Sequence, residues 1–258
     1  MGIFPFLSAF PVEQICNLFR NDADVEQNKR KIHFMGSEKK KGFQENNSVS
    51  YKRSLVAGML LGRASSRVIK GENGKLMAEF TVWHSLEQAD LIYWKAEEIN
   101  RLFNTDVVIS INYIHNEAGF SIIRGRRIRV IHKWFHRNGK KTVTDKIRFM
   151  DHPVGMAMLL CDKGSIKEHR NQTGECLSPC ITVAFSESDI ERLLNHIKNR
   201  CGAVGCSAPE CQQISFDAEN TKIFWEYVQP WMPGVQSVAD KFSSLGSAKE
   251  CRAAAVTA

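Results

Sequence analysis

The chain has 258 residues, which is long enough to bury a sizeable hydrophobic core in one large domain or two small ones. Its 35 lysines and arginines against 28 acidic residues give a net charge of +7, which favours an anionic partner. No apolar run reaches the ~18 residues of a membrane span, and the apolar start lacks the basic residues of a secretory signal. We therefore expect a soluble intracellular protein without a membrane partner.

Residues 1–50 are expected to form a basic, flexible arm. One stretch, 11–19, spaces its apolar residues as a short amphipathic helix does. Basic runs at 28–32 and 39–41 and a polar stretch at 44–50 follow. Such charge and polarity do not support a buried core, so most of the arm is predicted to be solvated.

Residues 51–148 predict elements in the order helix, hairpin, helix, hairpin, helix. Gly71–Gly74 is a turn signal between two strands, and Ser85 begins a helix whose apolar residues recur at helical spacing. A turn near 116–119 separates two longer strands. The expected elements are a helix at 54–62, strands at 67–69 and 77–83, a helix at 85–103, and strands at 107–114 and 120–131.

Residues 149–234 follow the same order less clearly, and residues 235–258 are expected to form a C-terminal tail. Ser186 to Asp189 can cap the helix that follows them. The expected elements are a helix at 154–162, a strand at 181–185, a helix at 186–197, short strands on either side of Pro209, and helices at 220–228 and 238–245. An αββαββα order that occurs twice predicts an α+β (mixed α/β) fold with antiparallel sheets.

A nine-residue pattern occurs in both halves, as Val56–Ala64 and Met156–Gly164, and the two copies start 100 residues apart. Each copy has small residues near its start, aliphatic residues behind them and a basic residue at its eighth position. Small residues allow two helices to approach closely. We therefore expect the copies to pack side by side on a pseudo-twofold axis, with Ala57, Gly58 and Ala157 in the contact.

The two copies resemble the LAGLIDADG motifs of homing endonucleases, in the single-chain form that carries two motifs. Lys133–Lys141 is similar to the family segment that joins the halves, and Phe224–Pro233 is similar to its closing helix. The resemblance implies two pseudo-symmetric αββαββα halves whose sheets form a nucleic-acid-binding saddle in a monomeric protein. It also implies an organelle (mitochondrion or plastid) or a bacterial cytoplasm as the compartment.

The chain departs from the family at the positions that carry catalysis. The eighth motif residue of the family is an acid that binds the catalytic divalent metal, whereas this chain has Arg63 and Lys163 there. Neither side chain offers an acceptor to a cation, so we expect no catalytic residues, no metal and no other cofactor. Asp162 lies about 100° around its helix from the eighth position, and it is the residual carboxylate from which a displaced Mg²⁺ site could be built.

Basic residues are concentrated between positions 124 and 148, where Asp145 is the only acid. On a strand at 120–131, Arg124 and Arg126 would face one way, and Arg127 and Arg129 the other. We interpret the set as phosphate contacts, and the alternative is an edge strand protected by charge. The predicted nucleic-acid-binding residues are Arg124, Arg126, Arg127, Arg129, Lys133, Arg137, Lys140, Lys141, Lys146 and Arg148.

Eight cysteines do not make a disulfide scaffold in a chain of this length. Five of them lie close together in the second half, but their spacings miss the CxxC pairs of structural zinc sites. We favour free thiols in a reducing compartment, with zinc as the alternative. The five residues are Cys176, Cys180, Cys201, Cys206 and Cys211.

Three functions follow from this interpretation. The favoured one is a degenerate member of the family that binds structured RNA or DNA without cleaving it, in an intron-maturase-like or ribosomal-RNA-bound role within a ribonucleoprotein. RNA is preferred because a maturase-like role does not need the metal site. The second is an active Mg²⁺-dependent, site-specific DNA homing endonuclease with displaced metal ligands. The third is a protein-interaction module, which the basic residues disfavour.

Overall fold

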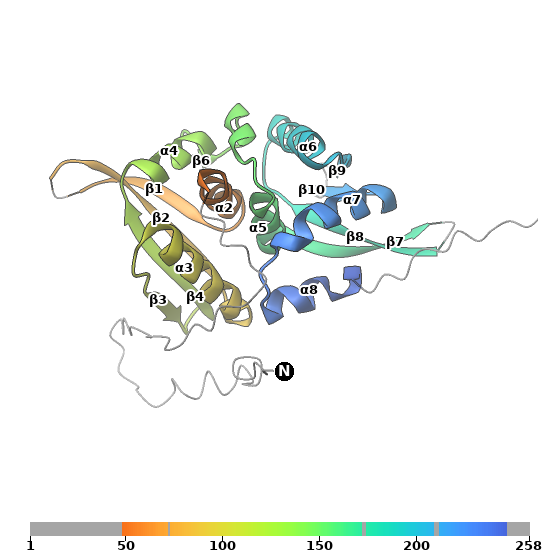
Figure 1. The fold of residues 1–258 in the computed structure, drawn as a ribbon, viewed down its shortest axis with the longest axis horizontal. Helices are drawn as coiled ribbons and strands as arrows, with labels where there is room; N and C mark the ends of the chain where they lie inside the picture. The colour runs from red at the N-terminus through yellow and green to blue at the C-terminus, as the bar shows by residue number, and fades with distance from the viewer. Residues whose placement is uncertain (1–47, 72, 172–173, 209–211, 247–258) are drawn as a thin grey trace, which may run out of the picture.

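The computed structural model describes residues 48–246 except 72, 172–173 and 209–211, so nearly all of the expected arm at 1–50 lies outside the described residues. The first half consists of α2 (Val49–Leu61), β1 (Ser65–Lys70), β2 (Leu76–Ser85), η1 (Leu86–Gln88), α3 (Ala89–Phe103), β3 (Ile109–Asn112), β4 (Glu117–Arg124) and α4 (Arg126–Phe135). The connection contains β5 (His136–Arg137), β6 (Lys140–Lys141) and η2 (Asp145–Phe149). The second half consists of α5 (Val154–Lys163), β7 (Gly164–Asn171), β8 (Gly174–Thr182), α6 (Glu187–Cys201), β9 (Gly205–Ala208), β10 (Gln213–Phe216) and α7 (Ala218–Val228), followed by η4 (Gln229–Trp231) and α8 (Gln236–Gly246). The mixed α/β class with two αββαββα halves is confirmed (Figure 1).

Each half has one four-stranded antiparallel sheet, with the equivalent orders β1-β2-β4-β3 and β7-β8-β10-β9. Burial alternates strictly along β2, because successive side chains of a strand point to opposite faces. Phe80 and Val82 are fully buried in the core, whereas Thr81 and Trp83 are only half-buried. We call the side that carries Thr81 and Trp83 the open face of the first sheet.

The motif helices α2 and α5 lie side by side at the centre of the molecule (Figure 1). Their backbones are in contact at Gly58 and Gly155, where a Cβ on Gly58 would lie 2.1 Å from the carbonyl oxygen of Gly155. Only glycine fits at such a backbone contact. The predicted pairing of the two copies is therefore confirmed, with Gly58 in the contact and Ala57 and Ala157 buried beside it.

The prediction of a strand through 120–131 is wrong beyond Arg124. β4 ends there, Gly125 interrupts it, and the following residues form α4. Ile128, Ile131 and Phe135 are buried at helical spacing, so the apolar face of a short helix explains this stretch better than a strand does. The arginines at 126, 127 and 129 therefore lie on a helix, and the argument from alternating strand faces does not apply to them.

The second half contains a strand that the sequence interpretation missed. β7 pairs with β8 along its whole length, from Gly164 opposite Ile181 to Asn171 opposite Gly174. β8 thus begins before the strand expected at 181–185 and ends at Thr182. The residues of β7 are mostly polar, so they show no apolar alternation that would have revealed a strand.

Helix ends differ modestly from the prediction. α2 begins at Val49, five residues early, and Ser48 caps it by accepting from the Tyr51 N–H. The predicted cap of α6 is present, because the Ser186 side chain accepts from the Asp189 N–H. None of the helices in the described part of the chain is long and apolar enough to cross a membrane.

Candidate nucleic-acid interface

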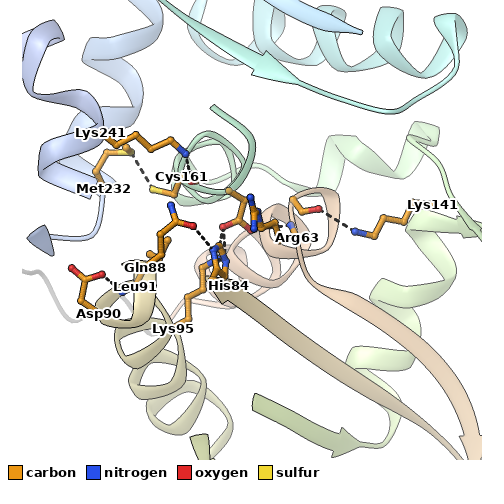
Figure 2. A network of polar contacts seen from close by, with 12 residues as sticks. Arg63, His84, Gln88, Asp90, Leu91, Lys95, Lys141, Cys161, Met232 and Lys241 are labelled. Atoms are coloured by element: carbon orange, nitrogen blue, oxygen red, sulfur yellow. Dashed lines mark hydrogen bonds and ion pairs between the residues drawn. The ribbon is translucent and has the colours of Figure 1, made fainter. Parts of the chain in front are cut away.

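The C-terminal ends of α2 and α5 are each capped by a lysine from a later part of the chain. Lys141 Nζ of β6 donates to the Gly62 carbonyl at 3.1 Å, and Lys241 Nζ of α8 donates to the Cys161 carbonyl at 2.8 Å (Figure 2). Unpaired carbonyls give a helix C-terminus partial negative charge, which a cation stabilises. The two lysines therefore place positive charge where the motif helices end.

The two altered motif positions lie close to these lysines. Arg63 follows the C-cap of α2 and is exposed, and Lys163 ends α5 and is half-buried. Burial and the charge of Lys163 together lower the pKa of Lys141 to about 8. Burial also lowers the pKa of Lys241, and the charge of Arg63 contributes. We call Arg63, Lys141, Lys163 and Lys241 the basic pole.

Asp162 carries the carboxylate that adjoins the basic pole, and both of its oxygens are engaged. Oδ1 accepts from Lys95 Nζ of α3, and Oδ2 accepts from the backbone N–H of Arg63 at 3.1 Å. The side chains of Asp162 and Lys95 are fully buried. Burial acts to raise the pKa of Asp162, but the charge of Lys95 outweighs it and holds this pKa well below its usual range.

His84 completes this network as a neutral ring. Its Nε2 lies 2.9 Å from Lys95 Nζ, and its Nδ1 lies 3.0 Å from Gln88 Oε1. An ammonium only donates, so Nε2 accepts from Lys95 and Nδ1 carries the hydrogen that it donates to Gln88. Burial, followed by the charge of Lys95, lowers the pKa of His84 in agreement with this assignment. Figure 2 shows His84, Gln88 and Lys95 of the first half within this network.

The ten predicted phosphate-binding residues do not form one cluster. Arg124 pairs with Ala78, on the buried side of the sheet. Four others lie on α4 (Arg126, Arg127, Arg129 and Lys133), where Arg129 Nη1 donates to the Leu76 carbonyl at 2.9 Å. Lys146 and Arg148 lie on η2. This short helix packs near the start of α2, as the contact of the Arg53 guanidinium with the Phe149 ring shows. These seven residues therefore lie on elements other than those that carry the basic pole.

The remaining three, Arg137, Lys140 and Lys141, lie on the β5–β6 hairpin beside a hollow of about 510 Å³. The hollow is lined by Arg137, Lys140, Lys141, Thr142, Ala184, Phe185, Ser186 and Asp189. The carboxylate of Asp189 accepts from Thr142 Oγ1 at 3.0 Å and from Arg192 Nη1 at 2.9 Å. The hollow is therefore positively charged, and it adjoins the basic pole through Lys141.

The described part of the chain contains no group of three or more residues that could hold a metal ion. Cys161, Cys180, Cys201 and Cys206 are free thiols. The side chains of Cys176 and Cys211 lie outside the described part of the structure.

Sequence reasoning missed Lys95, His84 and Lys241 as members of this site. Lys241 follows Lys141 by 100 residues, which is the offset between the two motifs, and this repetition could have revealed it. Lys95 and His84 carry no such signal. A lysine is rarely buried unless it is paired, and the partner of Lys95, Asp162, lies 67 residues further along the chain.

The sequence profile of the LAGLIDADG DNA endonuclease family matches residues 53–237, which is well over half of the chain. The chain belongs to this family. Its structure is similar to that of the homing endonuclease I-WcaI bound to its DNA recognition sequence, with a TM-score of 0.53 and 17% identity over 84% of this chain and 98% of that one. It also resembles I-DmoI in complex with DNA and Mn, with a TM-score of 0.48 and 10% identity over 73% of this chain and 100% of that one. None of the curated proteins matches the sequence.

The residues of this LAGLIDADG protein do not fit the divalent metal that the family implies. Mg²⁺ beside a phosphate is held by carboxylate oxygens. The two motif positions carry cations here, and the adjacent Asp162 has both oxygens engaged by Lys95 and Arg63. We therefore assign no metal-dependent step to these side chains.

The lowered pKa of Lys141 predicts that anion binding at the basic pole weakens above about pH 8. Protonated Lys141 attracts phosphate and loses its charge as the pH rises through its pKa, whereas an ordinary lysine stays charged to about pH 10. We expect the affinity for an oligonucleotide to fall by about tenfold between pH 7 and pH 9. The Lys141→Arg variant keeps its charge and should lose this dependence. An equal loss in both proteins would assign the titration to another group.

Proposed function

We propose that this protein binds structured RNA, with DNA as the alternative ligand, and does not cleave it. The observation that supports this most strongly is the basic pole, where four cations gather at the ends of the two motif helices. Guanidinium and ammonium groups bind phosphate oxygens through charge-assisted hydrogen bonds. Such a site holds a phosphate backbone without needing a metal.

RNA is the favoured ligand because a role in intron splicing or on ribosomal RNA would use the binding surface alone. The protein would act there as a monomer within a ribonucleoprotein, since one chain already supplies both halves of the pseudo-twofold body. An organelle or a bacterial cytoplasm is the compartment that this role implies.

The alternative is a Mg²⁺-dependent DNA endonuclease in which Asp162 serves as a displaced metal ligand. The closed network around Asp162 counts against it, because a metal would have to displace either Lys95 or the Arg63 N–H. A protein-interaction module without nucleic acid would leave the clustered cations without a role.

The salt dependence of binding tests the proposal. The logarithm of the binding constant should fall linearly with the logarithm of salt concentration. The magnitude of this slope should decrease by about 2 when Arg137 and Lys140 are both replaced by Gln, one for each lost phosphate contact. The matched control replaces Arg126 and Arg127, at the exposed start of α4, by Gln and should keep the slope. The reverse result would place the phosphate contacts on α4.

A further inference from the structure

The open face of the first sheet carries a tryptophan that the basic pole does not use. Trp83 of β2 lies opposite Gly119 of β4 in the ladder. A Cβ at position 119 would lie 2.4 Å from Cδ2 and 2.5 Å from Cε3 of the indole. The ring therefore occupies the space above Gly119, where any other residue would place its side chain.

The indole is bordered by hydroxyls that can form hydrogen bonds, and Glu117 lies on the same face, opposite Ser85. Ser110 of β3 is paired with Gly119 of β4, so it lies on the same face as the ring and next to it on the β3 side. Next to Trp83 along the same face, Thr81 Oγ1 and Ser121 Oγ lie 2.6 Å apart. Trp83 does not belong to the hydrophobic core, and among the described residues no other aromatic ring stacks on it. A half-exposed aromatic surface bordered by hydroxyls is thus available on this face.

The open face is continuous with the strand that leaves the basic pole. β1 begins two residues after Arg63, and Ser65, its first residue, is paired with Thr81 on the same face as Trp83. The charged pair on this face, Arg67 and Glu79, is closed on itself by a salt bridge. A phosphate backbone held at the basic pole would therefore bring its bases over the indole and its hydroxyls rather than over a further unpaired cation.

A half-exposed indole bordered by hydroxyls favours an unpaired nucleobase as its ligand. Bases within a duplex are already stacked on each other, so their faces are not accessible to a side chain on a sheet. Unpaired bases in RNA loops and bulges are free to stack on aromatic side chains, while hydroxyls bond to their edges or to the ribose 2′-OH.

We propose that Trp83 is a stacking site for an unpaired nucleobase of RNA, with Ser110, Thr81 and Ser121 as its polar border. The inference rests on the proposed function and makes it specific: the ligand presents a looped or bulged nucleotide beside the phosphates held at the basic pole.

The test compares two probes, an RNA hairpin with a uridine-rich loop and a fully paired RNA duplex with the same stem sequence. Trp83→Ala should weaken hairpin binding by roughly 5- to 150-fold, and Trp83→Phe should retain most of the affinity. Neither substitution should change duplex binding. The salt slope should stay that of the wild type, because no charge is removed. Tyr113→Ala removes an exposed aromatic side chain from the turn after β3 and should leave hairpin binding unchanged.

Each outcome separates the two proposals. If the wild type binds neither probe, the proposed function fails and this inference fails with it. If the wild type binds both probes but Trp83→Ala keeps full hairpin affinity, or weakens both probes equally, the stacking site is overturned while the proposed function stands. Trp83→Leu supplies an apolar side chain without an aromatic face, and it gives the same comparison if Trp83→Ala does not fold.

Discussion

Replacing Asp162 by Asn is expected to lower the free energy of unfolding by about 3–5 kcal/mol, since it leaves a fully buried ammonium on Lys95 without its counter-charge. Lys95→Met should lower the free energy of unfolding by a similar amount, because it leaves the buried carboxylate of Asp162 without its counter-charge. The double substitution Asp162→Asn with Lys95→Met should cost much less than the sum, because it leaves no unpaired buried charge. Urea denaturation at neutral pH measures all three.

The acid dependence of stability gives an independent check on the same pair. The pKa of Asp162 is held below its usual range in the folded protein, so the unfolded state binds more protons as the pH falls. The stabilisation is present above the unfolded pKa of about 3.9 and is lost as the pH falls below it. Asp162→Asn should lack this part of the pH dependence. Asp145→Asn, at a carboxylate that is mostly exposed, should leave stability nearly unchanged. Equal stabilities for Asp162→Asn and Asp145→Asn would contradict the buried pair.

Reversing both altered motif positions, Arg63→Asp with Lys163→Asp, should weaken nucleic-acid binding by roughly a hundredfold or more. Each charge-assisted hydrogen bond to a phosphate contributes about 1.5–3 kcal/mol, and a carboxylate at the same place repels the phosphate as well. Arg63 is exposed and Lys163 is half-buried, so neither new carboxylate would be fully buried and the fold should tolerate the change. Equilibrium titration of a labelled oligonucleotide at fixed salt measures the effect.

The control for this variant reverses the same charges elsewhere. Lys146→Asp with Arg148→Asp alters η2, which packs near the start of α2 rather than at the pole, and it should reduce affinity by only a few-fold. Equal losses in the two double variants would mean that net charge alone, and not the basic pole, determines binding.

The order of elements and the central helix pair were predictable because they depend on local patterns. Small residues at matching places in two copies predicted the contact at Gly58, and helical spacing predicted α3 and α6. Lys141 entered the predicted site only as one of ten basic residues, without its place beside Lys163.

The parts that could not be predicted depend on tertiary contacts. α4 was mistaken for a strand because it follows β4 after a single glycine, and helical spacing over so short a stretch is easily overlooked. The strand β7 is held by pairing with β8 and shows no apolar alternation. The pairing of Lys95 with Asp162 depends on the packing of α5 against the first half, which no local pattern encodes.

Incubating the purified protein with the nucleic acid that copurifies with it, in Mg²⁺ or Mn²⁺, tests most directly whether the basic pole binds without cutting. We predict that the nucleic acid stays bound and intact, with neither nicks nor double-strand breaks, because the motif helices present Arg63 and Lys163 and the carboxylate of Asp162 is fully engaged. Site-specific cuts that require the metal ion would contradict this account.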